Sequence, residues 1–333
     1  MKQTKLQWVE IDRAALKHNI QQFRHLIGET RKMTVVVKSN AYGHGLVEVS
    51  RLAIEFGADW LGVNSLEEAN VIRKSGIDLP IILLGYVPLV ELEEAVKKNL
   101  HMTVYNTETL EELGKVTSAL KKDAFLHIKT ETGVHRQGIE GEDLLPFVER
   151  IRKYPYLRIE GLSMHFANIE DTTDHSYAQH QLEKFIEYVD LLGQKGINIP
   201  VKHVACSAAT ILFPETYFEM VRVGIGVFGL WPSKETYLSC IKEQREPVNI
   251  KPVLTWKTRV VQIKDVQDGV FIGYGCTYKT TRPTKLAVLP VGYYDGYDRH
   301  LSNASYVLIA GKRAPVRGRV AMNFITVDVT DIS

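Results

Sequence analysis

Residues 35–45 read VVVKSNAYGHG, and the organisation of the chain can be worked out from this stretch. The three β-branched residues Val35, Val36 and Val37 predict a strand that is buried on both faces. The strand runs into Lys38, and a turn with two glycines follows it. We expect the next helix to begin directly after that turn, with its free N–H groups available to an anion.

Lys38, at the end of an apolar strand, has two interpretations. Its amine could reach water as an ordinary surface group, which is the commoner case. It could instead be partly desolvated and act as a nucleophile that forms a Schiff base. Tyr42 follows four residues later, and Gly43 and Gly45 allow a ligand to approach the backbone closely. An amine, a phenol and an anion site at a helix start together suit an aldehyde cofactor that carries a phosphate.

Length and composition exclude several classes of protein. The 333 residues suffice for one large barrel and a smaller unit, and 45% hydrophobic and 24% charged residues are ordinary for a globular protein. A net charge of +2, without a basic run interleaved with aromatics, argues against nucleic-acid binding. The apolar runs are too short or too interrupted to span a bilayer, and residues 1–5 (MKQTK) do not begin an export signal. Cys206, Cys240 and Cys276 lie far apart, which favours reduced thiols and a cytoplasmic location without a metal site.

Short apolar runs alternate with amphipathic stretches from about residue 33 to residue 230. Ser65 and Glu68 form a capping-box pattern, and residues 175–193 read as a long helix. Eight strands that alternate with helices predict a closed (β/α)8 TIM-like barrel. A doubly wound open sheet is the alternative, but it usually has fewer strands, and the first turn lacks GxGxxG. The expected strands are residues 34–37, 60–63, 81–84, 102–105, 125–129, 160–165, 201–205 and 222–228.

The pattern changes after about residue 235, where the helical period disappears and short strands with Gly, Asp and Lys at the turns follow. We therefore expect a barrel over residues 12–238 and a mostly β domain over residues 239–333. Residues 1–11 contain an alternating strand that could pair with the β domain. The strands expected in that domain are residues 253–263, 269–272, 285–288, 306–309 and 324–329.

Several polar side chains are expected at the carboxyl ends of the barrel strands, where the chemistry of such barrels takes place. Lys38, Lys129 and His165 would close three strands, Ser207 follows a fourth, and Arg222 would begin the last. Each has an ordinary alternative, such as a structural histidine, a helix N-cap or a surface ion pair. Their convergence at one end of one barrel favours a shared site.

These motifs resemble the alanine racemase family, whose cofactor is pyridoxal 5'-phosphate, over residues 8–331. The resemblance implies that Lys38 holds the cofactor covalently and that Tyr42 contacts its phosphate. It implies that Arg136 binds the cofactor's phenolic oxygen and the substrate carboxylate. Lys129, often carbamylated in the family, would hold Arg136 in place.

The same resemblance places His165 against the cofactor ring and Arg222 at its pyridine nitrogen, with Ser207 and the backbone of Gly224 and Ile225 on the phosphate. A carboxylate opposite the nitrogen would protonate it, whereas an arginine cannot give up its proton at ordinary pH. The negative charge that forms at the substrate Cα is then less delocalised over the cofactor ring. Return of a proton to Cα is therefore favoured over transamination.

Racemisation needs a base on each face of the substrate, and Lys38 supplies one. Tyr274, in Gly-Tyr-Gly at 273–275, reads from the sequence alone as a turn tyrosine. The resemblance implies that it is the second base and acts across a homodimer interface, with active sites shared between subunits. Met322 would line the substrate pocket in the same way. Arg299, Arg319 and Asp171 match polar residues of the family's substrate entrance less closely.

The sequence departs from the family pattern at two places. Asn323 stands where an aspartate is usual, which puts strict alanine specificity in doubt. The family runs several dozen residues beyond the point where this chain stops at Ser333, so we expect a truncated β domain.

The prediction is an amino-acid racemase that interconverts L- and D-alanine by transfer of the Cα proton between two bases, for peptidoglycan synthesis. The alternatives are a serine or broad-specificity racemase of the same fold, a barrel-type decarboxylase, and a non-catalytic barrel that binds pyridoxal phosphate. The glycine-rich loop of the decarboxylases is missing, and residues 240–333 argue against the non-catalytic barrel. We expect no metal, nucleic acid or membrane partner.

Overall fold

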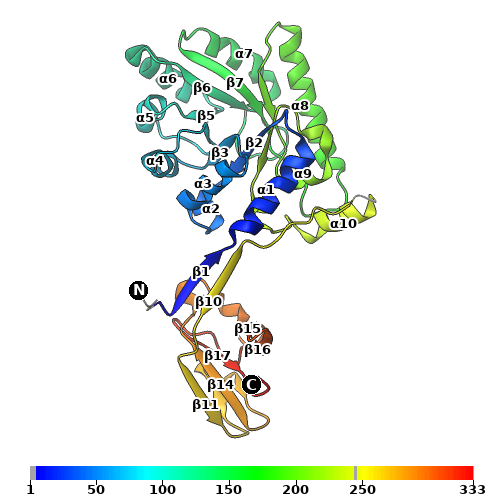
Figure 1. Ribbon diagram of the computed structural model, residues 1–333. Helices are drawn as coiled ribbons and strands as arrows, with labels where there is room; N and C mark the ends of the chain where they lie inside the picture. The colour runs from blue at the N-terminus through cyan, green and yellow to red at the C-terminus, as the bar shows by residue number, and fades with distance from the viewer. Residues whose placement is uncertain (1–4, 244–245, 333) are drawn as a thin grey trace. The chain divides into compact units, whose positions relative to one another are not determined.

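A computed structural model describes residues 5–243 and 246–332. The expectation about an export signal at residues 1–5 therefore lies largely outside the described residues. The chain divides into two compact units, one of residues 12–253 and one of residues 1–11 with 254–333 (Figure 1). The sequence places this boundary earlier, after residue 238. Within the described residues, no helix combines the length and apolarity that a membrane span requires.

The larger unit is the expected (β/α)8 barrel, with eight parallel strands in its described part. The strands pair in the order β8-β7-β6-β5-β4-β3-β2-β9. A backbone hydrogen bond of 2.9 Å from the N–H of Arg222 to the carbonyl of Ala205 links the two ends of this order, so the barrel is nearly closed. The strands are β2 (Lys32–Val36), β3 (Trp60–Val63), β4 (Ile81–Leu83), β5 (His101–Val104), β6 (Ala124–Lys129), β7 (Leu157–Ser163), β8 (Val201–His203) and β9 (Met220–Val223).

The barrel strands are apolar because both of their faces are covered. Every residue of β3, β4 and β9 is buried, as are residues 33–36 of β2. The helices pack outside the strands, as Figure 1 shows. This two-sided burial explains why short continuous apolar runs located the strands in the sequence.

Four of the ten described helices begin where a side chain caps them. Asp12 accepts a hydrogen bond of 2.9 Å from Ala15 N–H, and Asn106 accepts one of 2.8 Å from Thr109 N–H. The helices are α1 (Arg13–Ile27), α2 (Lys38–Tyr42), α3 (Leu46–Glu55), α4 (Leu66–Lys74), α5 (Leu92–Lys97), α6 (Thr107–Leu120), α7 (Gly141–Arg152), α8 (Ser176–Gln194), α9 (Ser207–Leu212) and α10 (Lys234–Lys242). Short 3-10 turns are η1 (Leu89–Glu91), η2 (Pro214–Thr216) and η3 (Ile225–Phe228).

The expectation that helical structure ends at about residue 235 was wrong, because α10 runs to Lys242. Ser233 is its N-cap and accepts a hydrogen bond of 2.9 Å from Thr236 N–H. Glu235 lies in the first turn, where a negative charge favours a helix. The helix is too short for its apolar residues to show a clear helical period in the sequence.

The smaller unit is mostly β. Strand β1 (Gln7–Ile11) pairs antiparallel with β10 (Leu254–Thr258), so the first strand belongs to this unit. Its core holds Ala287, Leu289, Val316, Ile325 and Val327. The other strands are β11 (Gln262–Val266), β12 (Phe271–Ile272), β13 (Tyr278–Lys279), β14 (Thr284–Leu289), β15 (Tyr306–Ile309), β16 (Lys312–Pro315) and β17 (Ile325–Asp328), with 3-10 turns η4 (Tyr274–Cys276), η5 (Tyr293–Asp295) and η6 (Arg299–Leu301).

Candidate active site

The segment labelled α2, which follows β2, is a left-handed turn and not an ordinary right-handed helix. Ser39, Asn40 and Ala41 have φ of 55°, 55° and 52° with ψ of 52°, 44° and 50°, and Tyr42 has φ of 55°. The right-handed helix begins at Leu46, as α3, directly after the two glycines, as expected. Left-handed backbone costs a residue with a Cβ roughly 1–2 kcal/mol. Strain of this kind is found mainly at functional sites.

Glu68 holds this turn from the neighbouring βα unit. Its carboxylate accepts one hydrogen bond from the N–H of Ser39 and one of 2.8 Å from the N–H of Asn64. The side chain of Asn40 accepts a bond of 2.9 Å from Leu46 N–H, which joins the turn to α3. The sequence revealed Glu68 only as a capping residue of α4, so this role was missed.

Tyr42, Ser207 and Gly224 come together at the carboxyl ends of β2, β8 and β9. The hydroxyl of Ser207 accepts hydrogen bonds of 2.9 Å and 3.2 Å from the N–H groups of Gly224 and Gly226. A Cβ on Gly224 would lie 2.5 Å from the phenolic oxygen of Tyr42, so only glycine allows this approach. Ile225 follows as the first residue of η3. Burial, assisted by Cys206, raises the pKa of Tyr42, so its phenol stays protonated and can donate.

The charges of four basic side chains act on His165. Burial lowers the pKa of His165 well below its ordinary value, and the charges of Lys129, Arg222, Arg136 and Lys38 lower it further. The imidazole is therefore neutral at physiological pH. The expectation that His165 closes its strand was wrong, because β7 ends at Ser163 and the histidine lies two residues beyond.

Arg222 is the third residue of β9, so it does not begin the strand as expected. Its side chain is 7% exposed and donates 2.9 Å to the carbonyl of Met164 and 2.6 Å to Nδ1 of His203. Burial lowers the pKa of Arg222 to about 10, which leaves the guanidinium charged at neutral pH. No sequence pattern indicated that a second histidine, besides His165, contacts this arginine.

Lys129 closes β6, as expected. Burial, followed by the charges of Arg222 and Arg136, lowers the pKa of Lys129 well below its ordinary value, and Glu131 opposes the shift. The neutral amine, which is the nucleophilic form, is therefore favoured more than in an exposed lysine.

Glu131 organises the loop that carries Arg136. Its carboxylate accepts hydrogen bonds from the N–H groups of Gly133, of Val134 at 2.7 Å and of Arg136 at 3.3 Å. Burial acts to raise the pKa of Glu131, but these backbone donors outweigh it and the pKa is lowered. The carboxylate is thus already engaged by the loop backbone.

The remaining candidates belong to the smaller unit. Tyr274, at the start of η4, is 74% exposed, and Met322 is 53% exposed. The guanidinium carbon of Arg319 would lie 3.0 Å from a Cβ built on Gly275, so Arg319 borders the Tyr274 turn. The guanidinium of Arg299 lies 5.8 Å from the ring centre of Tyr293.

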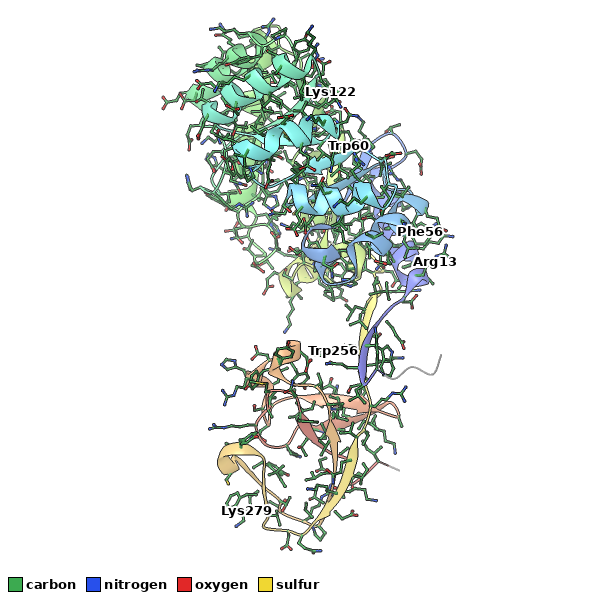
Figure 2. All side chains as sticks on the ribbon, turned by 90° about the vertical axis from the view of Figure 1, so that its left-hand side faces the viewer. Arg13, Phe56, Trp60, Lys122, Trp256 and Lys279 are labelled. Atoms are coloured by element: carbon green, nitrogen blue, oxygen red, sulfur yellow. The ribbon has the colours of Figure 1, made fainter. Side chains whose placement is uncertain are left out.

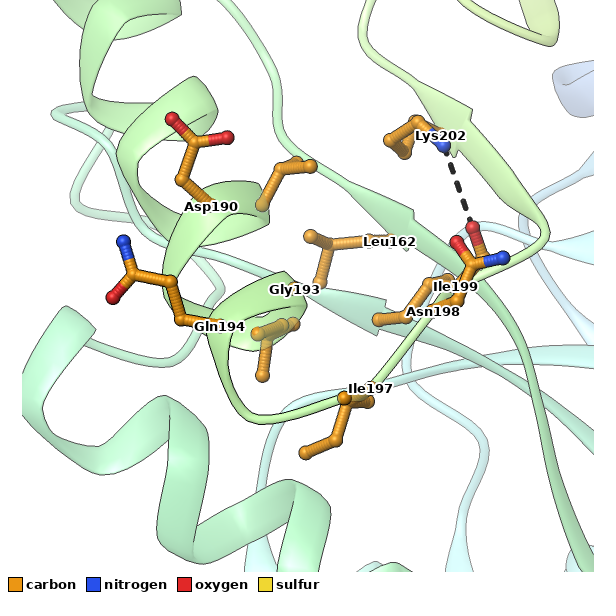
Figure 3. A pocket seen from close by; sticks show the side chains of 11 residues that line it. Leu162, Asp190, Gly193, Gln194, Ile197, Asn198, Ile199 and Lys202 are labelled. Atoms are coloured by element: carbon orange, nitrogen blue, oxygen red, sulfur yellow. Dashed lines mark hydrogen bonds between the residues drawn. The ribbon is translucent and has the colours of Figure 1, made fainter.

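A cavity of about 690 Å³ lies elsewhere on the barrel (Figure 3). Polar groups in its lining come from Asp190 in α8, Asn198 in the segment that leads into β8, and Lys202 in β8. None of the candidate residues lines it. The candidate site therefore depends on side-chain convergence at the strand ends and not on this cavity.

The barrel, the β unit and the matches to known proteins define an isomerase of the amino-acid racemase class. The alanine racemase N-terminal domain matches residues 11–232, and the C-terminal domain matches residues 253–333. The chain belongs to the alanine racemase family.

The relatives and solved structures that this chain resembles are also alanine racemases. Alanine racemase of Leptospira interrogans is 38% identical over 332 residues, which cover 100% of this chain and 85% of that protein. Alanine racemase of Methanococcus maripaludis is 40% identical over 326 residues, 98% of this chain and 85% of its own. The structure of alanine racemase from Clostridium difficile 630 has a TM-score of 0.91 at 34% identity and covers 98% and 84% of the two chains. That from Bacillus anthracis with bound L-Ala-P has a TM-score of 0.89 at 34% identity, with 98% and 83% covered.

Proposed function

We propose that the protein interconverts L- and D-alanine with pyridoxal 5'-phosphate as cofactor. The observation that carries this proposal is the set of basic side chains whose charges act on His165: Lys38, Arg136 and Arg222, with Lys129 among them. Glu131, the carboxylate beside Lys129, is already bonded to the loop backbone. Unbalanced positive charge of this kind favours bound anions. The cofactor phosphate and the substrate carboxylate are two such anions.

The residues present fit this cofactor. Tyr42 and Ser207 offer hydroxyl groups and Ile225 a backbone N–H group for a phosphate, while the N–H of Gly224 is donated to Ser207 and holds its hydroxyl in place. Lys38, half-buried at the barrel mouth, provides the amine for the aldehyde. When bound, the cofactor supplies an electron sink that stabilises negative charge at the substrate Cα.

The chain's own residues direct the proton transfer. Arg136 binds the substrate carboxylate, and Lys129, carbamylated, holds Arg136. Lys38 moves a proton to and from one face of Cα, and Tyr274 does so on the other face. Arg222 would face the ring nitrogen of the bound cofactor and, because it keeps its proton, would not protonate that nitrogen, which would favour return of the proton to Cα.

We also propose that two copies of the chain share their active sites. Tyr274, Tyr294, Met322 and Phe324 are exposed by 74%, 77%, 53% and 48%. Exposed apolar side chains in such numbers mark interaction surfaces. A homodimer would bring Tyr274 of the partner subunit to the second face of Cα. The product D-alanine would serve peptidoglycan synthesis in the cytoplasm.

Asn323 favours a second candidate, a serine or broad-specificity racemase. It is exposed and follows Met322 directly, at the position where the family usually has an aspartate. An amide in place of a carboxylate removes a negative charge and can donate a hydrogen bond to a substrate hydroxyl. Turnover of L-serine faster than that of L-alanine would select this candidate.

The two-base proposal is tested by exchange of Cα hydrogen with deuterium in D2O, followed by NMR for each enantiomer. Tyr274→Phe should stop exchange from L-alanine while Lys38 still exchanges the Cα proton of D-alanine. Tyr306→Phe, a partly exposed tyrosine of β15, is the matched control and should exchange both enantiomers. Equal loss from both enantiomers in Tyr274→Phe, with cofactor bound, would contradict the assignment.

Mixed dimers test whether Tyr274 acts across an interface. Lys38→Ala and Tyr274→Phe subunits are each inactive, but a mixed dimer has one site with both residues intact. Partial recovery of racemisation on mixing is expected. No recovery, once mixed dimers are demonstrated, would refute action between subunits.

A further inference from the structure

Three imidazoles form a continuous file inside the barrel, which we call the histidine file: His203, His127 and His101. His203 ends β8, His127 lies within β6, and His101 begins β5. Nε2 of His203 lies 2.8 Å from Nδ1 of His127, and Nε2 of His127 lies 3.3 Å from Nδ1 of His101. His127 and His203 are 0% and 1% exposed. The file thus runs from the catalytic end of the barrel to its opposite end.

The hydrogen bonds of the histidine file have one direction. A guanidinium only donates, so Nδ1 of His203, 2.6 Å from Nη1 of Arg222, must accept. His203 is then neutral, with its proton on Nε2, and donates to Nδ1 of His127. By the same reasoning His127 carries its proton on Nε2 and donates to Nδ1 of His101. The hydrogen bond from Arg222 is therefore compatible with only one tautomer of each of the three rings.

Charges at both ends of the histidine file oppose its protonation. Burial is the largest cause that lowers the pKa of each ring. Arg222 and Lys129 act on His203 from the catalytic end, and Lys32 and Arg73 act on His101 from the other end. The pKa of His101 falls to about 4.

The packing around His127 restricts its imidazole ring to a single position. Trp60, labelled in Figure 2, packs edge-on against His101 and His127, with ring centres 4.3 Å and 5.8 Å away. A Cβ on Gly161 would lie 2.1 Å from Nδ1 of His127, so only glycine leaves room for the ring. The strand register between β6 and β7 shifts between Leu126 and His127, which accommodates this contact.

We propose that His127, supported by His101, is a positioning residue that locks the tautomer of His203 and so holds Arg222 as a charged donor facing the cofactor ring. The role of Arg222 toward the ring rests on the proposed function; the lock itself does not. If His127 no longer accepts from His203, the His203 proton can move to Nδ1. The Nδ1–H of His203 and the Nη1–H of Arg222 are then two donors that face each other, and the guanidinium must shift.

The lock is tested directly by long-range ¹H–¹⁵N NMR of the holoenzyme labelled in histidine, with the three signals assigned from single variants. We expect neutral Nε2–H tautomers for all three rings near neutral pH. An imidazolium, or an Nδ1–H tautomer at His203 or His127, would overturn the proposal. This readout does not depend on turnover, so an inactive wild-type enzyme would count against the proposed function and not against the lock.

Two substitutions at one position separate the lock from simple packing. His127→Asn keeps an acceptor near the position of Nδ1, whereas His127→Phe removes it. In His127→Phe we expect His203 to populate the Nδ1–H tautomer, the pH profile of cofactor absorbance to shift, and kcat to fall by up to about a hundredfold with little change in KM. His127→Asn should restore the tautomer and most of kcat, and His175→Asn, outside the histidine file, should leave both unchanged.

Unchanged His203 tautomer and absorbance profile in His127→Phe would refute the role of His127. If that variant does not fold, His101→Phe removes the last acceptor at a less buried ring. It should then move the proton of His127 to Nδ1 in part of the population. A His127 signal identical to wild type in His101→Phe would overturn the proposal equally.

Discussion

The hydroxyl of Ser207 accepts a hydrogen bond of 2.9 Å from the backbone N–H of Gly224. It also accepts one from Gly226, so two donors occupy its oxygen. A serine hydroxyl has one hydrogen to give and two lone pairs, and here the hydrogen remains for a further acceptor. Tyr42, protonated because burial raises its pKa, points a second hydroxyl at the same place. Two strands and one turn thus converge on a position suited to a phosphate oxygen.

Replacing Ser207 by alanine is expected to weaken binding of pyridoxal 5'-phosphate. Loss of a hydrogen bond to a charged group costs about 1.5–3 kcal/mol, which is roughly a tenfold to hundredfold rise in Kd. Titration of the apoenzyme, followed by cofactor absorbance, measures it. Ser207 is the first residue of α9 and not its N-cap, so the expected alternative role as a cap was wrong. Ser233→Ala, at the start of α10, controls for loss of a serine hydroxyl elsewhere in the larger unit. Equal Kd values for the two variants and the wild type would contradict the phosphate assignment.

Lys129 should react with carbon dioxide. Its lowered pKa leaves a neutral amine, which adds to CO2 to form a carbamate and releases one proton. The product carries a negative charge next to Arg222 and Arg136, which stabilise it. Protein equilibrated with ¹³C-labelled bicarbonate is expected to show a carbamate carbon signal that Lys129→Arg lacks. A signal that persists in Lys129→Arg would mean that another amine is modified.

The barrel is expected to lose stability as the pH falls below about 6.5. The pKa values of His101, His127, His165 and His203 are lowered from 6.5 in the folded protein. Below that pH the unfolded chain binds more protons than the folded one, so acid favours unfolding. Each group contributes at most about 1.4 kcal/mol per pH unit.

Urea unfolding at several pH values between 6.5 and about 5 measures this slope. His101→Phe should reduce the slope, because one buried titrating group is removed. His300→Phe, whose side chain is 97% exposed, should leave it unchanged. A slope that is the same in all three proteins would show that the folded state does not suppress the protonation of His101.

Ser39 tests the strain of the left-handed turn, because its side chain is exposed. Ser39→Val should lower the free energy of unfolding by about 1–2 kcal/mol, since a β-branched side chain tolerates this backbone poorly. Ser39→Gly should be neutral or slightly stabilising, as relief of strain offsets the entropy of the unfolded glycine. Ser118→Val, exposed in the right-handed helix α6, should cost less than Ser39→Val. Similar costs for the two valines would argue against strain at Ser39.

The sequence predicted those features that local chemistry determines. Runs such as the residues of β3 show burial on both faces, so the barrel strands could be located to within a few residues. Lys129 was recognisable because it ends an apolar strand. The expectation that Lys38 closes its strand was wrong by two residues, because β2 ends at Val36, but the apolar run before it still marked the lysine. The strand ends expected at His165 and Arg222 were misplaced, because the point where a strand ends depends on its pairing with neighbouring strands.

Other features depend on contacts that arise only in the folded chain. The left-handed turn was missed because Ser39 and Ala41 have no intrinsic preference for this backbone conformation. The turn is held by Glu68, which comes from the neighbouring βα segment of the same unit. The histidine file was invisible because its members lie on three strands that meet only when the barrel closes. Tyr274 had no local signal beyond two flanking glycines, and only the family resemblance singled it out.

The most direct test of the central claim is the optical activity of L-alanine solutions during incubation with the purified, cofactor-loaded protein. The account predicts that the signal decays to zero as equal amounts of the enantiomers form, and that D-alanine decays to the same end point. Lys38→Ala should show neither the visible absorbance of bound cofactor nor any decay. A wild-type protein that binds the cofactor through Lys38 yet leaves the optical activity of both enantiomers unchanged would contradict the account.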